Sequence, residues 1–292
     1  MISQESLFLV EDTTRSERSL HTPGDFVKQN LLYVQEVGFL QSIKPHSCVR
    51  EKLDSYLFFV VLEGKGSLDV QDRHYELSAR DCVLVDCMDH YKHRSAEQDS
   101  WKLAWVHFNG QGAKGYYELF LKNNKNENVF QTVDTESWER RIRQLLDLQK
   151  DKSLSAELHC GELLLQLVNS VIDELMNDFS TDSRQQADML RKYLNDQYER
   201  SDVAADAEKV LGKTLCELNI DFKKYFGISI EEYVNNRRLT AAKELLRFSI
   251  KPIADIAIEC GIGDAAIMQQ MFREKENMTA EEYRMKWAQW IR

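Results

Sequence analysis

The sequence lacks the features that mark membrane proteins, secreted proteins and disulfide-rich domains. No run of about eighteen apolar residues is present, and the stretch from Met1 to Ser19 is polar and acidic, unlike a signal peptide. Six cysteines are scattered over 292 residues without a CxxC pair, as is typical of reduced thiols in a chain too large to need disulfide staples. We therefore expect a cytoplasmic protein that makes no membrane contact.

The common catalytic motifs are also missing. The sequence contains no Gly-x-Ser-x-Gly elbow, no phosphate loop, no His-Glu-x-x-His pair and no dinucleotide fingerprint. Each of these motifs carries a specific chemistry, so their absence lowers the expectation of an enzyme. We predict no catalytic activity and no cofactor.

A helix-turn-helix pattern occupies the C-terminal region. Ile253, Ile256 and Ala257 recur at helical spacing, the turn Gly261-Ile262-Gly263 follows, and Asp264 opens a second helix. Its apolar side is expected to pack through Ile267, Met268, Met271 and Phe272. The opposite side is free to read DNA, which makes five further residues candidates: Ala265, Ala266, Gln269, Gln270 and Arg273.

The pattern repeats fifty positions earlier, which predicts a second, tandem helix-turn-helix unit. The residues of the earlier copy are Val203, Ala207, Leu218, Phe222, Lys223, Ser229, Glu231, Glu232 and Tyr233. They correspond to Ile253, Ala257, Met268, Phe272, Arg273, Thr279, Glu281, Glu282 and Tyr283. Between the copies, Ile230 to Phe248 has the spacing of one long helix, with Arg238 among its polar positions.

Three stretches in this region together resemble the AraC/XylS family of bacterial transcription regulators. They are FKKYFGISIEEYVNNRRLTAAKELL (Phe222 to Leu246), IADIAIECGIGD (Ile253 to Asp264) and MTAEEYRMKW (Met278 to Trp287). The resemblance covers roughly the last hundred residues. It implies promoter DNA as a partner, contacted by Asp264 and Arg238 as well as by the outward residues of each second helix.

The first unit departs from the family pattern. Its reading side would carry Leu215, Cys216, Asn219, Ile220 and Lys223, of which Asn219 and Lys223 suit base and phosphate contacts. Glu217 and Asp221 would fall on its packing side, where an unpaired carboxylate costs several kcal/mol. Gly212 also stands one place later than Gly261 under the fifty-residue shift. Either the register slips in the turn or this unit is altered.

The charge of the chain is uneven. From Arg184 onward it carries 18 Lys and Arg and 18 Asp and Glu, so the whole net charge of −10 belongs to the first 183 residues. Neutralisation of DNA phosphates by Lys and Arg supplies most of the non-specific affinity for DNA. A C-terminal region with no net charge has no excess of positive charge for this purpose. A sensor or interaction protein with impaired DNA binding is the alternative hypothesis.

β-strand signals fill the N-terminal half. LLYVQEVGFLQSI, YLFFVVLEGKGSLDV, HYELSARDCVLVDC and WKLAWVHFNG alternate in the manner of short strands and predict a barrel or a sandwich. Tyr56 to Gly110 resembles the cupin-like domain found in many members of the same family. That resemblance implies a small barrel that senses a small-molecule effector, with sugars and related metabolites the common case.

Four residues are the candidate ligand contacts, because they combine aromatic surface with hydrogen-bonding groups: Tyr91, His93, Trp105 and His107. Histidines and aspartates also gather nearby, at His90, His93, His107, Asp86 and Asp89. Their spacing does not reproduce the His-x-His with later Glu and His of cupin enzymes, so no metal is predicted. A metal-dependent cupin enzyme is kept as the third hypothesis.

Helical periodicity returns from Ser137 to Phe179. An apolar stripe there can pack onto its own barrel or onto a second subunit, and the resemblance to the family implies homodimerisation through it: Leu164, Leu167, Val168, Val171 and Leu175. We predict an α+β multidomain protein with an arm (1–30), a barrel (31–136), a helical dimerisation segment (137–179), a linker (180–186) and an all-α tandem helix-turn-helix domain (187–292). A ligand-responsive transcription regulator follows, with RNA polymerase as a further candidate partner.

Overall fold

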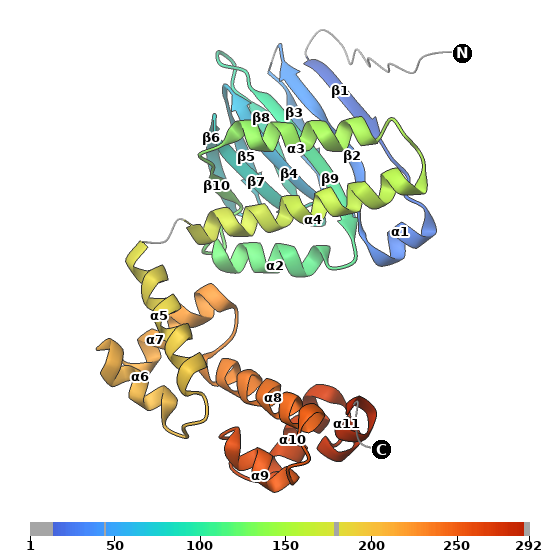
Figure 1. Ribbon diagram of the computed structural model, residues 1–292. Helices are drawn as coiled ribbons and strands as arrows, with labels where there is room; N and C mark the ends of the chain where they lie inside the picture. The colour runs from blue at the N-terminus through green and yellow to red at the C-terminus, as the bar shows by residue number, and fades with distance from the viewer. Residues whose placement is uncertain (1–13, 44, 178–180, 289–292) are drawn as a thin grey trace. The chain divides into compact units, whose positions relative to one another are not determined.

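Antiparallel strands form the first part of the chain. The computed structural model describes residues 14–43, 45–177 and 181–288. Two units are distinguished, Met1–Asp178 and Phe179–Arg292. The N-terminal unit contains β1 (Thr14–Leu20), α1 (Asp25–Asn30), β2 (Leu32–Ser42), β3 (Ser47–Arg50), β4 (Tyr56–Glu63), β5 (Lys65–Val70), β6 (Arg73–Ser78), β7 (Asp81–Asp86), β8 (Tyr91–Ser95), β9 (Lys102–Gly110), α2 (Ala113–Asn123), β10 (Val129–Gln131), α3 (Thr135–Leu148) and α4 (Leu154–Asn177) (Figure 1).

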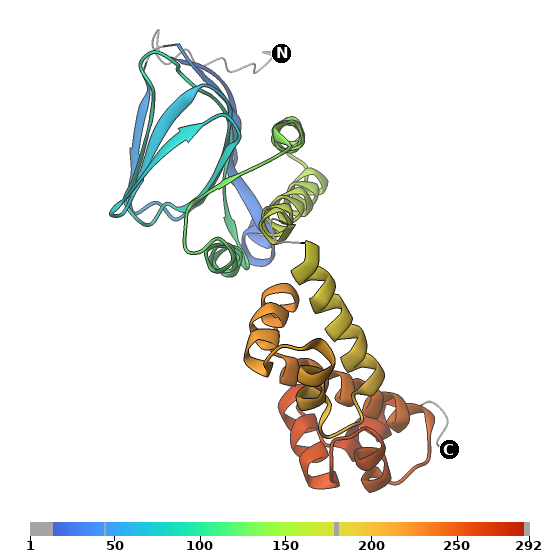
Figure 2. The ribbon, with the colours of Figure 1, turned by 90° about the vertical axis from the view of Figure 1, so that its left-hand side faces the viewer.

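Two sheets face one another and enclose an apolar interior (Figure 2). The six-stranded sheet has the order β1-β2-β9-β4-β7-β10, and the four-stranded sheet has the order β3-β8-β5-β6. Phe59, Leu68 and Trp101 lie in the core between the sheets with at most 1% of their surface exposed. The predicted α+β architecture with an N-terminal barrel is confirmed.

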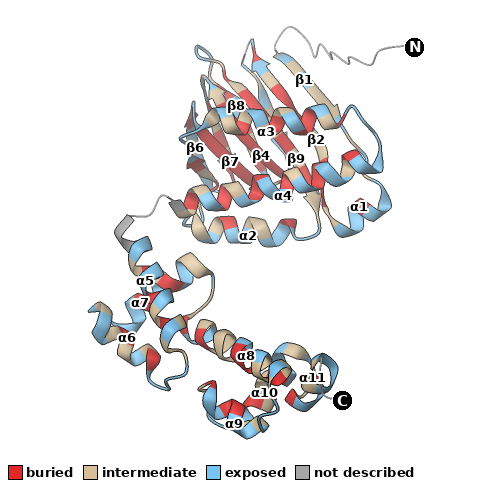
Figure 3. Ribbon diagram, viewed as in Figure 1, coloured by how far each residue is buried: buried red, intermediate tan, exposed pale blue. Residues whose placement is uncertain are grey.

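Helices α2, α3 and α4 cover the outer face of the six-stranded sheet (Figure 1). Successive residues of a strand point to opposite faces, so Phe58 packs under the helices while Phe59 points into the barrel. Asp134 caps the N-terminus of α3, its carboxylate accepting a hydrogen bond from the amide of Ser137 at 3.0 Å. The buried positions of α3 and α4 lie on the side that faces the sheet (Figure 3).

The apolar stripe of α4 belongs to the core of its own unit. Its five side chains are at most 9% exposed and pack against the six-stranded sheet: Leu164, Leu167, Val168, Val171 and Leu175. The prediction of dimerisation through these residues is wrong, because an apolar stripe specifies that a helix is covered but does not specify by what. Among the large apolar residues that α4 exposes are Leu154, Leu158 and Leu165.

The segments predicted as an arm and as a linker contain more regular structure than the sequence indicates. Residues 1–13 of the predicted arm lie outside the described residues, but β1 pairs with β2 along seven residues and α1 follows it. β1 gives little alternating signal because its sequence, TRSERSL, is mostly polar. The predicted linker, 180–186, belongs to a helix from Thr181 onward. Thr, Asp and Ser, which suggested a linker, are also the residues that open helices.

The described part of the C-terminal unit, residues 181–288, contains seven helices: α5 (Thr181–Gln197), α6 (Val203–Leu211), α7 (Leu215–Phe226), α8 (Ile230–Phe248), α9 (Ile253–Glu259), α10 (Ala265–Glu276) and α11 (Ala280–Trp287). One core surrounds Leu190, Phe222 and Val234, and a second surrounds Leu246 and Phe272. α8 contributes to both cores, from its first half and its second half respectively. The predicted pair of helix-turn-helix units joined by a long helix is therefore present.

Candidate functional site

The second helix-turn-helix is built as the sequence predicts. α9 is followed by Gly261 and Gly263, which take φ values of 70° and 107° and so turn the chain where other residues would be strained. Asp264 then caps α10, its carboxylate accepting a hydrogen bond from the amide of Ile267 at 2.8 Å. The role of Asp264 visible in the structure is thus to start the helix.

Two buried side chains, Met268 and Phe272, fix the orientation of α10. Ala265 is half-buried at the edge of this contact. The sequence predicts that Ile267 packs, but it is 48% exposed, because Met268 and Phe272 are the residues of α10 that enter the core. The exposed outward side carries three residues of the predicted reading surface: Ala266, Gln270 and Arg273.

α7 repeats this construction in the first unit. Thr214 caps α7 at the position equivalent to Asp264, and its side chain exchanges hydrogen bonds with Glu217 in a capping box. Leu218 and Phe222 are buried at the positions of Met268 and Phe272. The fifty-residue repeat also places equivalent caps on the following helices, Ser229 on α8 and Thr279 on α11.

The acidic residues of α7 are not buried on its packing side. Glu217 is exposed and belongs to the capping box, while Asp221 is half-buried and pairs with Lys213 at 3.1 Å. The prediction that they face the core is therefore wrong. The one-residue offset of Gly212 is confined to the turn, where this residue ends α6 with φ 65°, and the register is restored at Thr214.

Two predicted base contacts, Asn219 and Gln269, instead connect each second helix to the helix after it. The amide of Ile230 donates to Oδ1 of Asn219 at 2.9 Å, and the amide of Ala280 donates to Oε1 of Gln269 at 2.9 Å. Ile230 and Ala280 are the first residues of α8 and α11, whose amides have no partner within their own helices. Both side chains are half-buried and hold the helices together.

Arg238 also has a partner inside the protein. Its guanidinium donates to the carbonyl of Tyr198 at 2.7 Å and to the carbonyl of Arg200 at 2.8 Å, in the loop between α5 and α6. The same loop touches the second unit, because a Cβ on Gly261 would lie 2.2 Å from the carbonyl oxygen of Glu199. This loop, residues 198–200, thus contacts both α8 and the turn between α9 and α10.

Ion pairs occupy many of the positive charges of the C-terminal unit. They join Lys213 to Asp221, Lys243 to Glu276, Lys251 to Glu259, and Lys275 to Glu232. Lys223 and Arg273, at equivalent positions on α7 and α10, are exposed and form no ion pair with another described residue. These two cations are available to phosphates.

The structure brings the four predicted ligand residues together inside the barrel. Tyr91 and His93 share one face of β8, with ring centroids 5.9 Å apart, and Trp105 and His107 share one face of β9, with ring centroids 5.8 Å apart. The Cys87 thiol lies between the pairs, 3.9 Å from Nδ1 of His107 and next to the Tyr91 hydroxyl. Tyr91 and His93 are buried, and the other two are half-buried.

The side chains of Tyr91, His93 and His107 are uncharged at neutral pH. Burial lowers the pKa of His93 to about 3, assisted by the positive charges of His46, His107 and Arg50, and it lowers the pKa of His107 to about 4. Burial likewise raises the pKa of the Tyr91 hydroxyl. Neutral imidazoles and a protonated phenol can both donate and accept hydrogen bonds.

Some of these groups have unused hydrogen-bonding capacity. Nδ1 of His107 lies 3.0 Å from the Ser55 hydroxyl. In the described part of the chain, Nδ1 of His93 has no hydrogen-bond partner, and the Tyr91 hydroxyl has no oxygen or nitrogen partner. Buried polar atoms are normally paired, so these atoms mark the place where a polar ligand would be held.

His46 and Trp101 belong to the same interior, although sequence reasoning did not select them. Each ring centroid lies 5.8 Å from that of His93, and neither Nδ1 of His46 nor Nε1 of Trp101 has a partner among the described residues. His46 precedes β3 in an irregular stretch, where alternation predicts no direction. The two-residue alternation of a strand could have identified Trp101, because it lies an even number of residues before Trp105 and His107 and therefore points to the same face.

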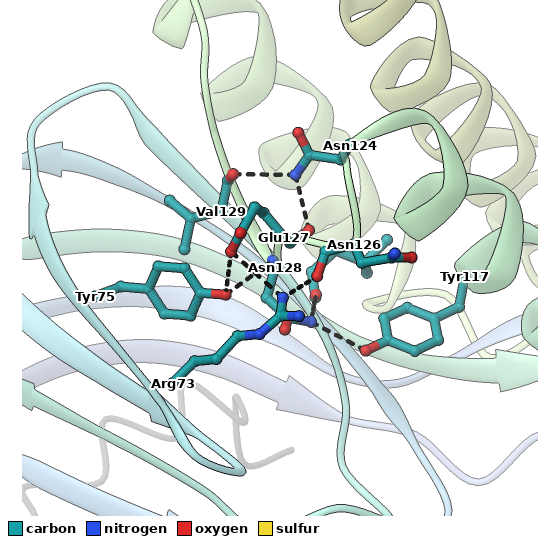
Figure 4. A network of polar contacts seen from close by, with 9 residues as sticks. Arg73, Tyr75, Tyr117, Asn124, Asn126, Glu127, Asn128 and Val129 are labelled. Atoms are coloured by element: carbon teal, nitrogen blue, oxygen red, sulfur yellow. Dashed lines mark hydrogen bonds and ion pairs between the residues drawn. The ribbon is translucent and has the colours of Figure 1, made fainter. Parts of the chain in front are cut away.

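A second polar network links residues of β6, of α2 and of the segment before β10 (Figure 4). The Tyr75 hydroxyl donates to the Glu127 carboxylate at 2.7 Å, and Arg73 pairs with the same carboxylate at 3.4 Å. Asn128, which is buried, donates to the Tyr117 hydroxyl at 3.0 Å. The network joins β6 of the four-stranded sheet to α2 and the segment before β10, and so connects the two sheets.

Metal sites and membrane spans are not found in the part of the chain that the structure describes. No group of three or more His, Cys, Asp or Glu side chains there could hold a metal ion. No described helix is both long enough and apolar enough to cross a membrane. A surface depression between α3 and α4, lined by Leu148, His159 and Leu163 among others, contains none of the predicted ligand residues.

Comparison with known proteins assigns a family to each unit. Residues 33–168 match the AraC-like ligand binding domain, and residues 209–286 match a helix-turn-helix domain. The lactose operon transcription activator of Staphylococcus xylosus is 24% identical over 234 residues, which is 77% of this chain and 82% of the relative. The Msm operon regulatory protein of Streptococcus mutans is 22% identical over 242 residues, 79% and 84% of the two chains.

Among solved structures, ToxT of Vibrio cholerae is 13% identical and aligns over 94% of this chain and 98% of its own, with a TM-score of 0.31. The two family matches agree with the barrel and with the paired helix-turn-helix units described above. This chain belongs to the AraC family and is a ligand-responsive, sequence-specific DNA-binding regulator of transcription.

Proposed function

We propose that the effector is a small uncharged polar molecule of the sugar class, held inside the barrel, and that promoter DNA is contacted by the outward sides of α7 and α10. The observation that carries the first part is the set of buried, uncharged hydrogen-bonding groups around His93. Homologues in the same family are transcription regulators, so the proposal includes no catalytic activity.

The chemistry of the interior favours a neutral ligand. A buried charge needs a compensating charge, and His93 and His107, being held neutral, supply none; the Arg50 guanidinium, whose positive charge acts on both histidines, is the cation against which an anionic ligand has to be tested. Sugars present hydroxyl groups that can pair with the Tyr91 hydroxyl and the imidazole nitrogens, together with C–H faces that pack on an aromatic ring such as Trp105. One relative is the activator of a lactose operon, which supports sugars as the first class to test.

Removal of the Tyr91 hydroxyl is expected to weaken effector binding by about fivefold, the value of one uncharged hydrogen bond. The measurement is tryptophan fluorescence of wild-type protein and Tyr91→Phe, titrated with neutral mono- and disaccharides and with the corresponding uronic acids. Tyr116→Phe, on α2 outside the barrel interior, is the matched control. Tighter binding of uronic acids, or no binding of any neutral sugar at millimolar concentration, would contradict the neutral-sugar assignment.

The DNA part of the proposal rests on the repeat. α7 and α10 carry equivalent caps and equivalent buried residues, so their outward sides are presented in the same way. Tandem units of this kind meet successive major-groove faces about 34 Å apart. Lys223 and Arg273 are assigned to phosphates and Gln270 to an adenine edge. Asn219, Gln269 and Arg238 are left out of the reading set because their side chains serve the fold.

Arg273→Ala is expected to weaken binding by about tenfold and to reduce the slope of log affinity against log salt concentration by about one. The assay is fluorescence anisotropy on duplexes tiled across the upstream region of the gene, at several salt concentrations, with and without sugar. Lys122→Ala, an exposed cation of the N-terminal unit, makes the same change in net charge and should leave both values unchanged. No binding at low salt, with or without sugar, would favour the alternative of impaired DNA binding.

Effector binding would act by changing the geometry that the arm, the linker region or a second copy of the chain imposes on the DNA-binding unit. A homodimer is part of this proposal, and sedimentation equilibrium of the purified protein tests it. RNA polymerase is the remaining partner proposed, as expected of a regulator that acts at promoters. A metal-dependent enzyme has no supporting observation among the described residues.

A further inference from the structure

The outward side of α7 is apolar at its centre. Of the polar residues in its first two turns, Glu217 is taken up by the capping box, Asn219 by the amide of Ile230 and Asp221 by its ion pair with Lys213. Two residues remain at the centre, Cys216 and Ile220, and both are exposed; Ile220 has 63% of its surface accessible. A helix that reads bases through hydrogen bonds would carry amides or guanidinium groups at these positions.

The fifty-residue repeat identifies what this apolar surface faces. Ile220 stands at the position of Gln270 on α10, at the centre of the side presented to DNA. Lys223 lies one turn further along the same side of α7, where it complements phosphates that flank the groove. The apolar patch and its adjacent cation therefore fit the floor and the edge of a major groove.

We infer that α7 reads its DNA subsite through the C5-methyl group of thymine, with Ile220 as the specificity-determining contact. This inference rests on the proposed DNA binding by α7. The thymine methyl is the one apolar group that the four natural base pairs present in the major groove. Guanine, adenine and cytosine present hydrogen-bonding groups at their major-groove edges. Ile220 would strip water from those groups without replacing the lost hydrogen bonds.

α10 is expected to read its subsite differently. Ala266 and Ile267 add apolar surface there, but Gln270 and Arg273 supply hydrogen-bonding groups. The amide of Gln270 donates to Glu274 at 2.8 Å in the protein alone, an exposed contact that an adenine edge can replace. The two subsites therefore differ in chemistry, and α7 supplies the one that depends on methyl groups.

Replacement of thymine by deoxyuridine tests the inference, because it removes only the methyl group. In the duplex that binds most tightly in the anisotropy assay, each thymine is replaced in turn. We expect at least one replacement in the α7 subsite to weaken wild-type binding by about fourfold, as for one buried methyl group. Ile220→Ala should bind the thymine and deoxyuridine duplexes with equal affinity at that position.

The controls separate this result from other failures. Val210→Ala removes a similarly exposed aliphatic side chain, 57% accessible, from α6 of the same unit, and should keep the full response to deoxyuridine. Ile220→Ala lies on an exposed helix position, and its thermal unfolding should match wild type. Tight binding that no thymine replacement weakens, or a response that persists in Ile220→Ala, overturns the inference and leaves the proposed function standing. Absence of binding to any duplex overturns both.

Discussion

Gly261→Ala is expected to destabilise the C-terminal unit by roughly 4 kcal/mol, enough to abolish DNA binding. Gly261 has φ 70°, which costs a non-glycine residue about 1 kcal/mol. The larger part is steric, because the new Cβ would lie 2.2 Å from the carbonyl oxygen of Glu199 and 2.6 Å from its carbonyl carbon. These are backbone atoms, so the whole loop must move.

The matched variant is Gly212→Ala in the first unit. Gly212 ends α6 with φ 65°, but a Cβ there meets no atom within 4 Å. We expect a loss of only about 1 kcal/mol, from backbone strain alone. Urea unfolding followed by circular dichroism measures both. Equal losses for the two variants would show that the contact between Gly261 and the loop at residues 198–200 does not exist.

Mild acid is expected to destabilise the N-terminal unit. The folded pKa values of His93 and His107, about 3 and about 4, lie below the value of about 6.5 for an unfolded histidine. Below pH 6.5 the unfolded chain therefore binds protons that the folded barrel does not, and stability falls as the pH decreases. Stability is complete above pH 6.5, and each histidine contributes a loss of about 1.4 kcal/mol per pH unit below it.

Thermal unfolding at pH 7.5, 6.5 and 5.5 measures this dependence. Glu36 and Asp86, whose pKa values burial raises, oppose part of the loss, and we expect a net decrease of about 2 kcal/mol between pH 6.5 and 5.5. His93→Gln stays neutral at every pH and should remove about half of the dependence. His90→Gln, at an exposed position, should leave it intact. A flat profile for wild type would refute the burial of neutral imidazoles.

The sequence predicts those parts of the fold that local periodicity determines. The helix-turn-helix pairs, the connecting helix and the strands of the barrel follow from spacing, and the four ligand residues converge because alternation placed each pair on one strand face. The partners of polar side chains are not local in this sense. Asn219 and Gln269 satisfy every sequence criterion for a reading residue, yet each accepts from an amide that lies eleven residues away.

Other errors have the same origin. Nothing in the stripe from Leu164 to Leu175 distinguishes packing onto a sheet from packing onto another subunit, and only the tertiary structure decides it. β1 forms because β2 offers an unpaired edge, although its own sequence is polar. The sequence already places Ile220 on the outward side of α7. Its importance became clear only from the structure, in which the neighbouring Glu217 and Asn219 make hydrogen bonds within the protein.

If α7 and α10 contact DNA as proposed, the loop at residues 198–200 sets the spacing between the two contacts. Arg238 holds its carbonyls from the connecting helix, and Gly261 lets the second turn rest against it. The distance between α7 and α10 and their rotation relative to one another are consequently fixed. One base pair added to the DNA between the α7 and α10 subsites would rotate one subsite by about a tenth of a turn relative to the protein helix that contacts it. On the proposed function, we therefore expect this regulator to select the helical phase of its two subsites in addition to their base sequence.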